Sequence, residues 1–169
     1  MSDEALYPGQ VRLRVHSPKS RFGPDIEEVS GRVLADKIGA LYRALRAADK
    51  AANGRVRHEY TAFKLSSSAP TVVLMERPIR ARQAKVFEPV SAIPAFDECV
   101  SAVTNGQPVQ PMQFDCVRQL SRLARGSSKQ FGYAELWTGD ERVYRVDTRE
   151  GPQAILPGTF KLGGVEHCV

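Results

Sequence analysis

Alternation of hydrophobic and polar residues predicts strands in the first half of the chain. Residues 10–16 alternate strictly, with Val, Leu and Val between polar neighbours. A period of two is typical of a strand with one buried face. Residues 55–65 alternate in the same way, and residues 71–77 form a short β-branched block. Because the sequence SSSAP separates these two, we expect an antiparallel pair with a connection longer than a two-residue turn.

Apolar residues at spacings of three and four predict three helices, over residues 30–52, 91–105 and 112–124. Ser30 and Ser91 are the expected N-caps of the first two helices. Each segment is followed by a glycine that favours helix termination, namely Gly54, Gly106 and Gly126. The side chains expected to be buried are Val33, Leu34, Ile38, Leu41, Tyr42, Leu45 and Ala48 in the first helix, Phe96, Cys99, Val100 and Val103 in the second, and Phe114, Val117, Leu120, Leu123 and Ala124 in the third.

Strand-like patterns return after residue 131. The stretches FGYAELW and RVYRVDT flank a turn at residues 138–141, and QAIL and residues 159–169 are further strand-like stretches. We therefore expect a C-terminal β meander of three or four strands. Runs of strands separate from runs of helices, which indicates an α+β fold: a mostly antiparallel sheet covered by one long and two shorter helices.

The length of 169 residues is typical of a single domain, 1–169, although residues 131–169 are a possible β-rich subdomain. The strand-like end of the sequence suggests that the chain is a fragment of a longer protein. Asp3 and Glu4 stand where a secretory signal would carry positive charge, and no apolar run approaches the roughly 20 residues of a membrane helix. We expect a cytoplasmic protein that has no membrane segment.

Candidate catalytic and metal-binding residues carry little signal. Cys99, Cys116 and Cys168 are widely spaced and form no CxxC pair, so neither a disulfide framework nor a zinc site is indicated, and we expect the first two thiols to be reduced core residues. No nucleotide-binding loop or GxSxG motif occurs, and no cofactor is predicted. His58 and Glu59 are neighbours on a strand and are expected to face opposite ways.

Two short segments could imitate functional sites. Asp25, Glu27 and Glu28 could contribute to a metal-dependent hydrolase, but a solvated acidic loop is the simpler interpretation. Residues 126–129, GSSK, follow a predicted helix, whereas a phosphate loop precedes one. We interpret them as a helix C-cap.

Basic residues form the clearest functional pattern. The formal net charge is +5, from 24 Lys and Arg against 19 Asp and Glu. Two clusters are candidate sites for anions or nucleic acid: Arg77, Arg80, Arg82 and Lys85, and Arg118, Arg122, Arg125 and Lys129. The second cluster has spacings of four, three and four, which predicts a positive stripe along the third helix. Such a stripe could neutralise phosphates without reading sequence, and it is also common on a solvated helix.

Three classes of function remain open from the sequence. Because no catalytic motif is present and exposed strand edges are expected, the first hypothesis is a non-catalytic module that binds a protein partner or its own copy. The second is a sequence-nonspecific nucleic-acid-binding protein that uses the basic clusters. The third is an enzyme whose site is assembled from scattered residues.

Overall fold

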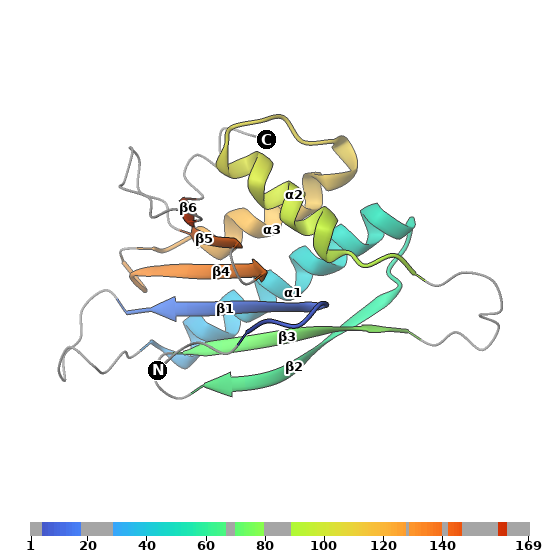
Figure 1. The fold of residues 1–169 in the computed structure, drawn as a ribbon. Helices are drawn as coiled ribbons and strands as arrows, with labels where there is room; N and C mark the ends of the chain where they lie inside the picture. Colours follow the sequence, from blue (N-terminus) through green and yellow to red (C-terminus); the bar gives the residue numbers. More distant parts are fainter. Residues whose placement is uncertain are drawn as a thin grey trace.

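The computed structural model describes residues 5–17, 29–66, 70–79, 89–127, 129–139, 142–146 and 159–161. In chain order its elements are β1 (Gln10–His16), α1 (Gly31–Asn53), β2 (His58–Ser66), β3 (Thr71–Pro78), α2 (Ile93–Thr104), the 3-10 turn η1 (Pro111–Gln113), α3 (Phe114–Ala124), β4 (Tyr133–Gly139), β5 (Arg142–Val146) and β6 (Thr159–Lys161) (Figure 1). The fold is α+β, as the sequence predicted.

The described strands form one sheet in the order β2-β3-β1-β4-β5-β6. The first five strands pair antiparallel, and β1 lies between β3 and β4. β3 therefore separates β1 from β2, which is the split β-α-β arrangement. The first four strands with α1 and α2 follow the β-α-β-β-α-β order called ferredoxin-like, and α3 is inserted before β4.

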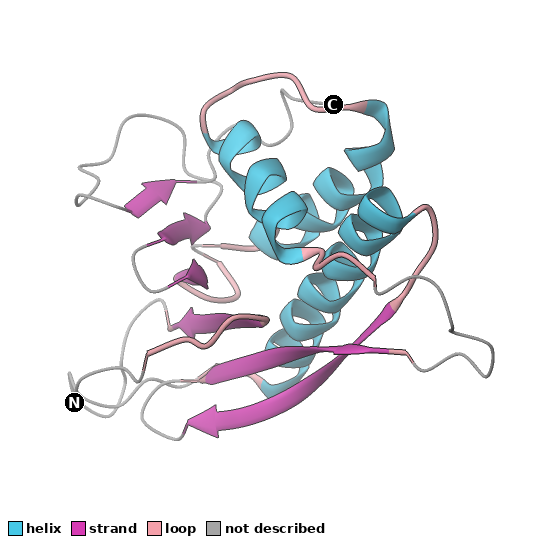
Figure 2. Cartoon of the chain, turned by 45° about the vertical axis from the view of Figure 1, so that its right-hand side comes forward, coloured by secondary structure: helices cyan, strands magenta, loops and turns pink. Residues whose placement is uncertain are grey.

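All three α-helices lie on one side of the sheet (Figure 2). The core forms where their apolar stripes meet the inward side chains of the strands. Leu13, Leu41, Phe96, Leu120 and Leu136 come from five different elements and are at most 1% exposed. Burial of Leu41, Leu45 and the α2 stripe confirms the helical periodicity read from the sequence.

Several predicted details differ from the structure. Phe114 is 44% exposed, and Cys116 lies in the buried stripe instead, because position 114 is off the side of the helix that positions 116, 120 and 123 share. Ser30 is the N-cap residue of α1, as predicted, but makes no side-chain cap hydrogen bond, and the N-cap of α2 is Ala92 rather than Ser91. β6 joins β5 in parallel, so this last pairing is not the antiparallel step of a meander. The QAIL stretch lies outside the described residues.

The helix-free side of β1 is more covered than a half-buried strand would be. Arg12 and Trp137 are each 7% exposed, although both point away from the helices. The guanidinium carbons of Arg12 and Arg14 lie 5.5 Å and 5.2 Å from the Trp137 ring centroid. These cation–π contacts hold both guanidinium groups against the indole on this side of the sheet.

No helix within the described ranges has the length and apolar character needed to cross a membrane.

Candidate functional site

The outward face of α1 carries a row of positive side chains. Arg32, Arg43, Arg46 and Lys50 are exposed, and Asp36 lies among them. When Asp36 is included, successive members of the row are four, seven, three and four residues apart. These spacings return to the same side of a helix, opposite the buried stripe. From residue 32 to residue 50 the row extends about 27 Å, at 1.5 Å per residue.

α3 extends this positive surface because it packs alongside α1. Arg43 Nε donates to Gln119 Oε1 at 3.2 Å, near the middle of both helices. Lys37, six residues earlier in α1, contacts the C-terminal end of α3, so the two helices run antiparallel. Arg118 and Arg122 point outward from α3, where Arg118 pairs with Asp115 at 3.3 Å.

A buried lysine joins the two helices. Lys37 is 1% exposed, and its Nζ donates to the carbonyl oxygens of Arg122 at 2.8 Å and Arg125 at 2.6 Å. These carbonyls are at the C-terminus of α3, where a cation complements the partial negative charge of the helix dipole. Burial lowers the pKa of Lys37, and nearby Asp36 opposes that shift. Lys37 thus fixes the backbone that carries Arg122 and Arg125.

The second basic cluster predicted from the sequence is only partly helical. Arg118 and Arg122 lie on α3, but the helix ends at Ala124, and Arg125 has an extended backbone. Gly126 follows with a φ of +85°, so the chain turns away before Lys129. The prediction that all four project from the third helix was therefore wrong, although all four are exposed. The C-cap of α3 is Arg125, and Gly126 turns the chain directly after it rather than capping the helix itself.

Of the first basic cluster, the structure describes only Arg77. Arg77 is exposed near the end of β3 and pairs in register with Glu59 of β2. Arg80, Arg82 and Lys85 lie outside the described residues, as do Asp25, Glu27 and Glu28. The structure therefore shows the position of the first cluster only at Arg77.

Positive charge is concentrated on α1, α3 and the turn after α3. Residues 31–53 and 114–129 contain nine Lys and Arg against three Asp, a net charge of +6, whereas the whole chain carries +5. Eight of those nine cations are exposed, and Asp36 and Asp115 are the exposed carboxylates in the same segments. The α1 cations are already at helical spacing in the sequence, but the sequence-based prediction named only the two basic clusters and did not include them.

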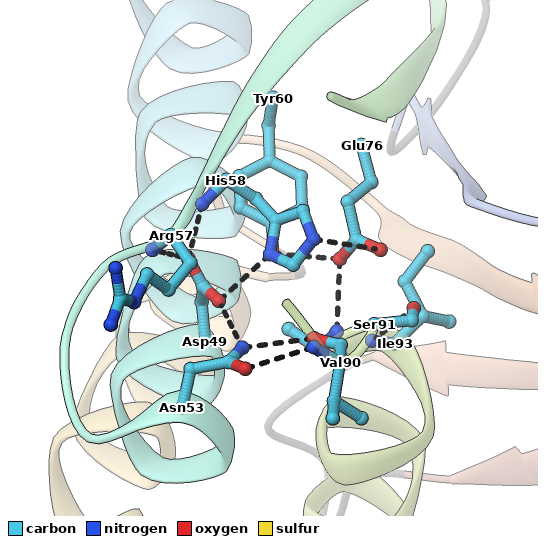
Figure 3. A network of polar contacts seen from close by, with 10 residues as sticks. Asp49, Asn53, Arg57, His58, Tyr60, Glu76, Val90, Ser91 and Ile93 are labelled. Carbon is cyan, nitrogen blue, oxygen red and sulfur yellow. Dashed lines mark hydrogen bonds and ion pairs between the residues drawn. The ribbon is translucent and has the colours of Figure 1, made fainter. Parts of the chain in front are cut away.

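A buried polar network lies at the C-terminal end of α1 (Figure 3). Asp49 is fully buried, and its Oδ2 accepts hydrogen bonds from the backbone N–H groups of Arg57 at 2.6 Å and His58 at 2.7 Å. Its Oδ1 accepts from His58 Nδ1 at 2.9 Å and from Asn53 Nδ2 at 2.8 Å. Asp49 therefore ties the start of β2 to the last turns of α1.

Glu76 completes this network from β3. Its Oε1 lies 3.8 Å from His58 Nε2, and its Oε2 accepts from the Tyr60 hydroxyl and from the Ala92 N–H, both at 3.0 Å. Burial is the main cause that raises the pKa of Tyr60. The exposed fractions of the His58, Asp49 and Glu76 side chains are 3%, 0% and 7%. Their burial and saturation indicate a structural clasp between α1, β2, β3 and the start of α2.

His58 is buried and its neighbour Glu59 is exposed, although the side chains of both contact residues of α1. Glu59 is exposed and accepts a hydrogen bond from the Tyr42 hydroxyl at 2.6 Å. The partners of His58 come from positions 9 and 18 residues away in the sequence, on other elements. Only the tertiary fold brings the two carboxylates to this imidazole.

A second buried carboxylate lies between α2 and the β4–β5 hairpin. Asp97 Oδ1 accepts from the Thr138 hydroxyl at 2.5 Å and from the Tyr144 hydroxyl at 2.7 Å, and its Oδ2 pairs with Arg142. Burial and the bond to Asp97 raise the pKa of Tyr144. Asp97, Thr138 and Arg142 line a groove of about 670 Å³ along α2.

Cys99 and Cys116 are buried, free of disulfide bonding and hydrogen-bonded to each other. Their contact, together with burial, raises the pKa of Cys116 well above its usual range, which disfavours a thiolate at Cys116, whereas the same contact lowers the pKa of Cys99. Among the described residues, no three His, Cys, Asp or Glu side chains are grouped so as to hold a metal ion. Cys168 lies outside the described part of the chain.

A scan against protein-family models and searches of the curated proteins and of the solved structures found no match to this chain.

Proposed function

We propose that the outward surface of α1 and α3 binds nucleic acid through its phosphates, without reading the base sequence. The observation that supports this proposal is the segregation of charge. Two helices and one turn carry a net charge of +6, so the remainder of the chain is close to neutral. A field concentrated on one surface attracts a polyanion more strongly than the same charge spread evenly.

The geometry of the surface favours backbone contacts. The long side chains of Arg43, Arg46 and Arg122 rise from the outer sides of two packed helices, where they can follow a line of phosphates. The 27 Å length of the α1 row would match about eight base pairs at 3.4 Å per step. Contacts of this kind position a protein on a duplex but carry no sequence information. A cytoplasmic location, which the sequence suggested, would give this surface access to nucleic acid.

The test is to measure affinity for a fluorescein-labelled duplex at several salt concentrations. Fluorescence anisotropy should detect binding at low salt, and log Kd should change linearly with log salt concentration. The paired substitution Arg118→Gln with Arg122→Gln, and separately Arg43→Gln with Arg46→Gln, should each lower the salt slope by up to about two units, roughly 0.9 per phosphate contact. Different base sequences should give the same affinities and slopes.

Arg77→Gln is the matched control. Arg77 is also an exposed arginine, but it lies on β3 in register with Glu59, on the side of the sheet away from the helices. Its substitution should leave the salt slope unchanged within about 0.3 units, since it contacts no phosphate in this proposal. Undetectable binding at low salt, or equal losses from all three variants, would contradict the proposed surface.

A further inference from the structure

The groove beside α2 is the second surface with a defined chemistry. It runs along α2 from Ile93 to Ala102 and continues to Pro108, with Thr138 and Arg142 on its opposite wall. Its volume of about 670 Å³ falls in the range of ligand-binding clefts. The distance from residue 93 to residue 102 is about 13 Å along a helix, which matches roughly four residues of extended peptide.

Residues of β4 and β5 hold the Asp97 side chain of the groove in place. Asp97 is fixed by the hydroxyls of Thr138 and Tyr144 and by Arg142, and each of these partners comes from the β4–β5 hairpin. Because Asp97 binds Arg142, the charge of that guanidinium is compensated within the molecule, although the Arg142 side chain remains 67% exposed. These contacts join α2 to β4 and β5, and thus connect the two walls of the groove.

The groove has the opposite charge to the surface of α1 and α3. No Lys or Arg occurs between Lys85 and Arg118, and the charged residues of α2 are Asp97 and Glu98. Glu98 is exposed and has no hydrogen bond or ion pair within the described residues. Among the described residues that line the groove, the charged side chains are Asp97, Glu98 and Arg142, which sum to a net charge of −1 in a chain of +5.

We infer that this groove binds an extended segment of a partner protein that carries a lysine or arginine side chain. The cation lies over Glu98, where it meets an uncompensated carboxylate beside the compensated Asp97–Arg142 pair. Ser101 and Gln107 offer hydroxyl and amide groups to the peptide backbone, and Ile93 and Pro108 offer apolar contacts at the two ends. Charge complementarity therefore sets the class of partner, and the shape of the groove sets its extended form.

The experiment selects binders from a phage-displayed library of random heptapeptides on the whole chain. Enriched peptides are then measured by fluorescence anisotropy against three variants. Glu98→Lys reverses the free charge, Ala102→Trp fills the groove from the half-exposed side of α2, and Asp36→Lys makes the same change of charge on α1. Circular dichroism of each variant checks that it is folded.

Enriched peptides should contain Lys or Arg, and Glu98→Lys and Ala102→Trp should each weaken them by roughly tenfold or more, while Asp36→Lys changes affinity by less than about twofold. Peptides without basic residues, or peptides that bind the two groove variants as well as the unmodified chain, would overturn the inference. Failure to enrich any peptide above the phage background would also overturn it. None of these outcomes depends on nucleic-acid binding, because the groove variants do not alter the cations of α1 and α3.

Discussion

Removing the Asp49 carboxylate should destabilise the protein more than any other single change to a charged residue discussed above. Asp49→Ala deletes an acceptor of four hydrogen bonds, two from backbone N–H groups and two from the side chains of His58 and Asn53. The N–H and Nδ1 of His58 are both buried, so water cannot replace the lost acceptor there. The variant therefore leaves buried donors without partners.

The expected loss follows from these contacts. Each buried donor left unpaired costs about 1 to 3 kcal/mol, and the more accessible Arg57 N–H and Asn53 amide add about 0.5 to 1.5 kcal/mol each as net hydrogen bonds. Because the four bonds share one network, their losses are not additive, and we expect about 3 to 6 kcal/mol. Domains of this size have unfolding free energies of about 5 to 15 kcal/mol. Asp49→Ala should therefore be close to the limit of folding.

Urea unfolding measures this loss through the fluorescence of Trp137. The chain has one tryptophan, and this side chain is 7% exposed on β4, so its emission should change when the sheet unfolds. Asp49→Asn keeps the volume but turns an N–H₂ group toward the same donors, and it should lose about 2 to 4 kcal/mol. Asp36→Asn, on the same helix with a side chain 61% exposed, is the control and should change stability by less than about 0.5 kcal/mol. A loss below about 1 kcal/mol for Asp49→Ala would refute the clasp.

The remaining predictions concern the core, the buried lysine and the thiols. Leu41→Ala should lower the unfolding free energy in urea by about 2 to 5 kcal/mol, since Leu41 is fully buried between α1 and the sheet, and an effect below about 1 kcal/mol would contradict this packing. Because burial lowers the pKa of Lys37 below the unfolded value of 10.5, the unfolded chain binds more protons between the two values, and stability should rise as pH increases toward 10.5. Lys37→Met should abolish this rise and cost about 1 to 3 kcal/mol by leaving the α3 carbonyls unpaired, as urea titrations at neutral pH and at pH 10.5 would show. Cys99 and Cys116 should react with a thiol reagent only after denaturant is added, and rapid labelling of both in the native protein would contradict their burial.

The local pattern of the sequence determined most of the secondary structure. The bounds of β1 were predicted to the residue, and the predicted helix of residues 30–52 differs from α1 by one residue at each end. These elements are predictable because a strand repeats every two residues and a helix every 3.6, so the buried face of each one is visible in its own sequence. Gly54 ends α1 with a positive φ angle, and Gly126 turns the chain in the same conformation just after the end of α3, because glycine adopts it without a steric penalty.

The polar contacts were decided by the tertiary structure. Lys37 occupies a position on the buried side of α1, and the packing of α3 supplies the two carbonyls that make a buried ammonium acceptable. His58 contacts Asp49 of α1 and Glu76 of β3. The spacing of these three residues along the chain does not predict that their side chains meet. The positive surface likewise exists because α1 and α3 pack antiparallel, which places two separate arginine rows side by side. Hydrophobic periodicity records which side of an element is buried, but the partner of a polar group depends on which elements meet, and that is fixed only when the chain folds.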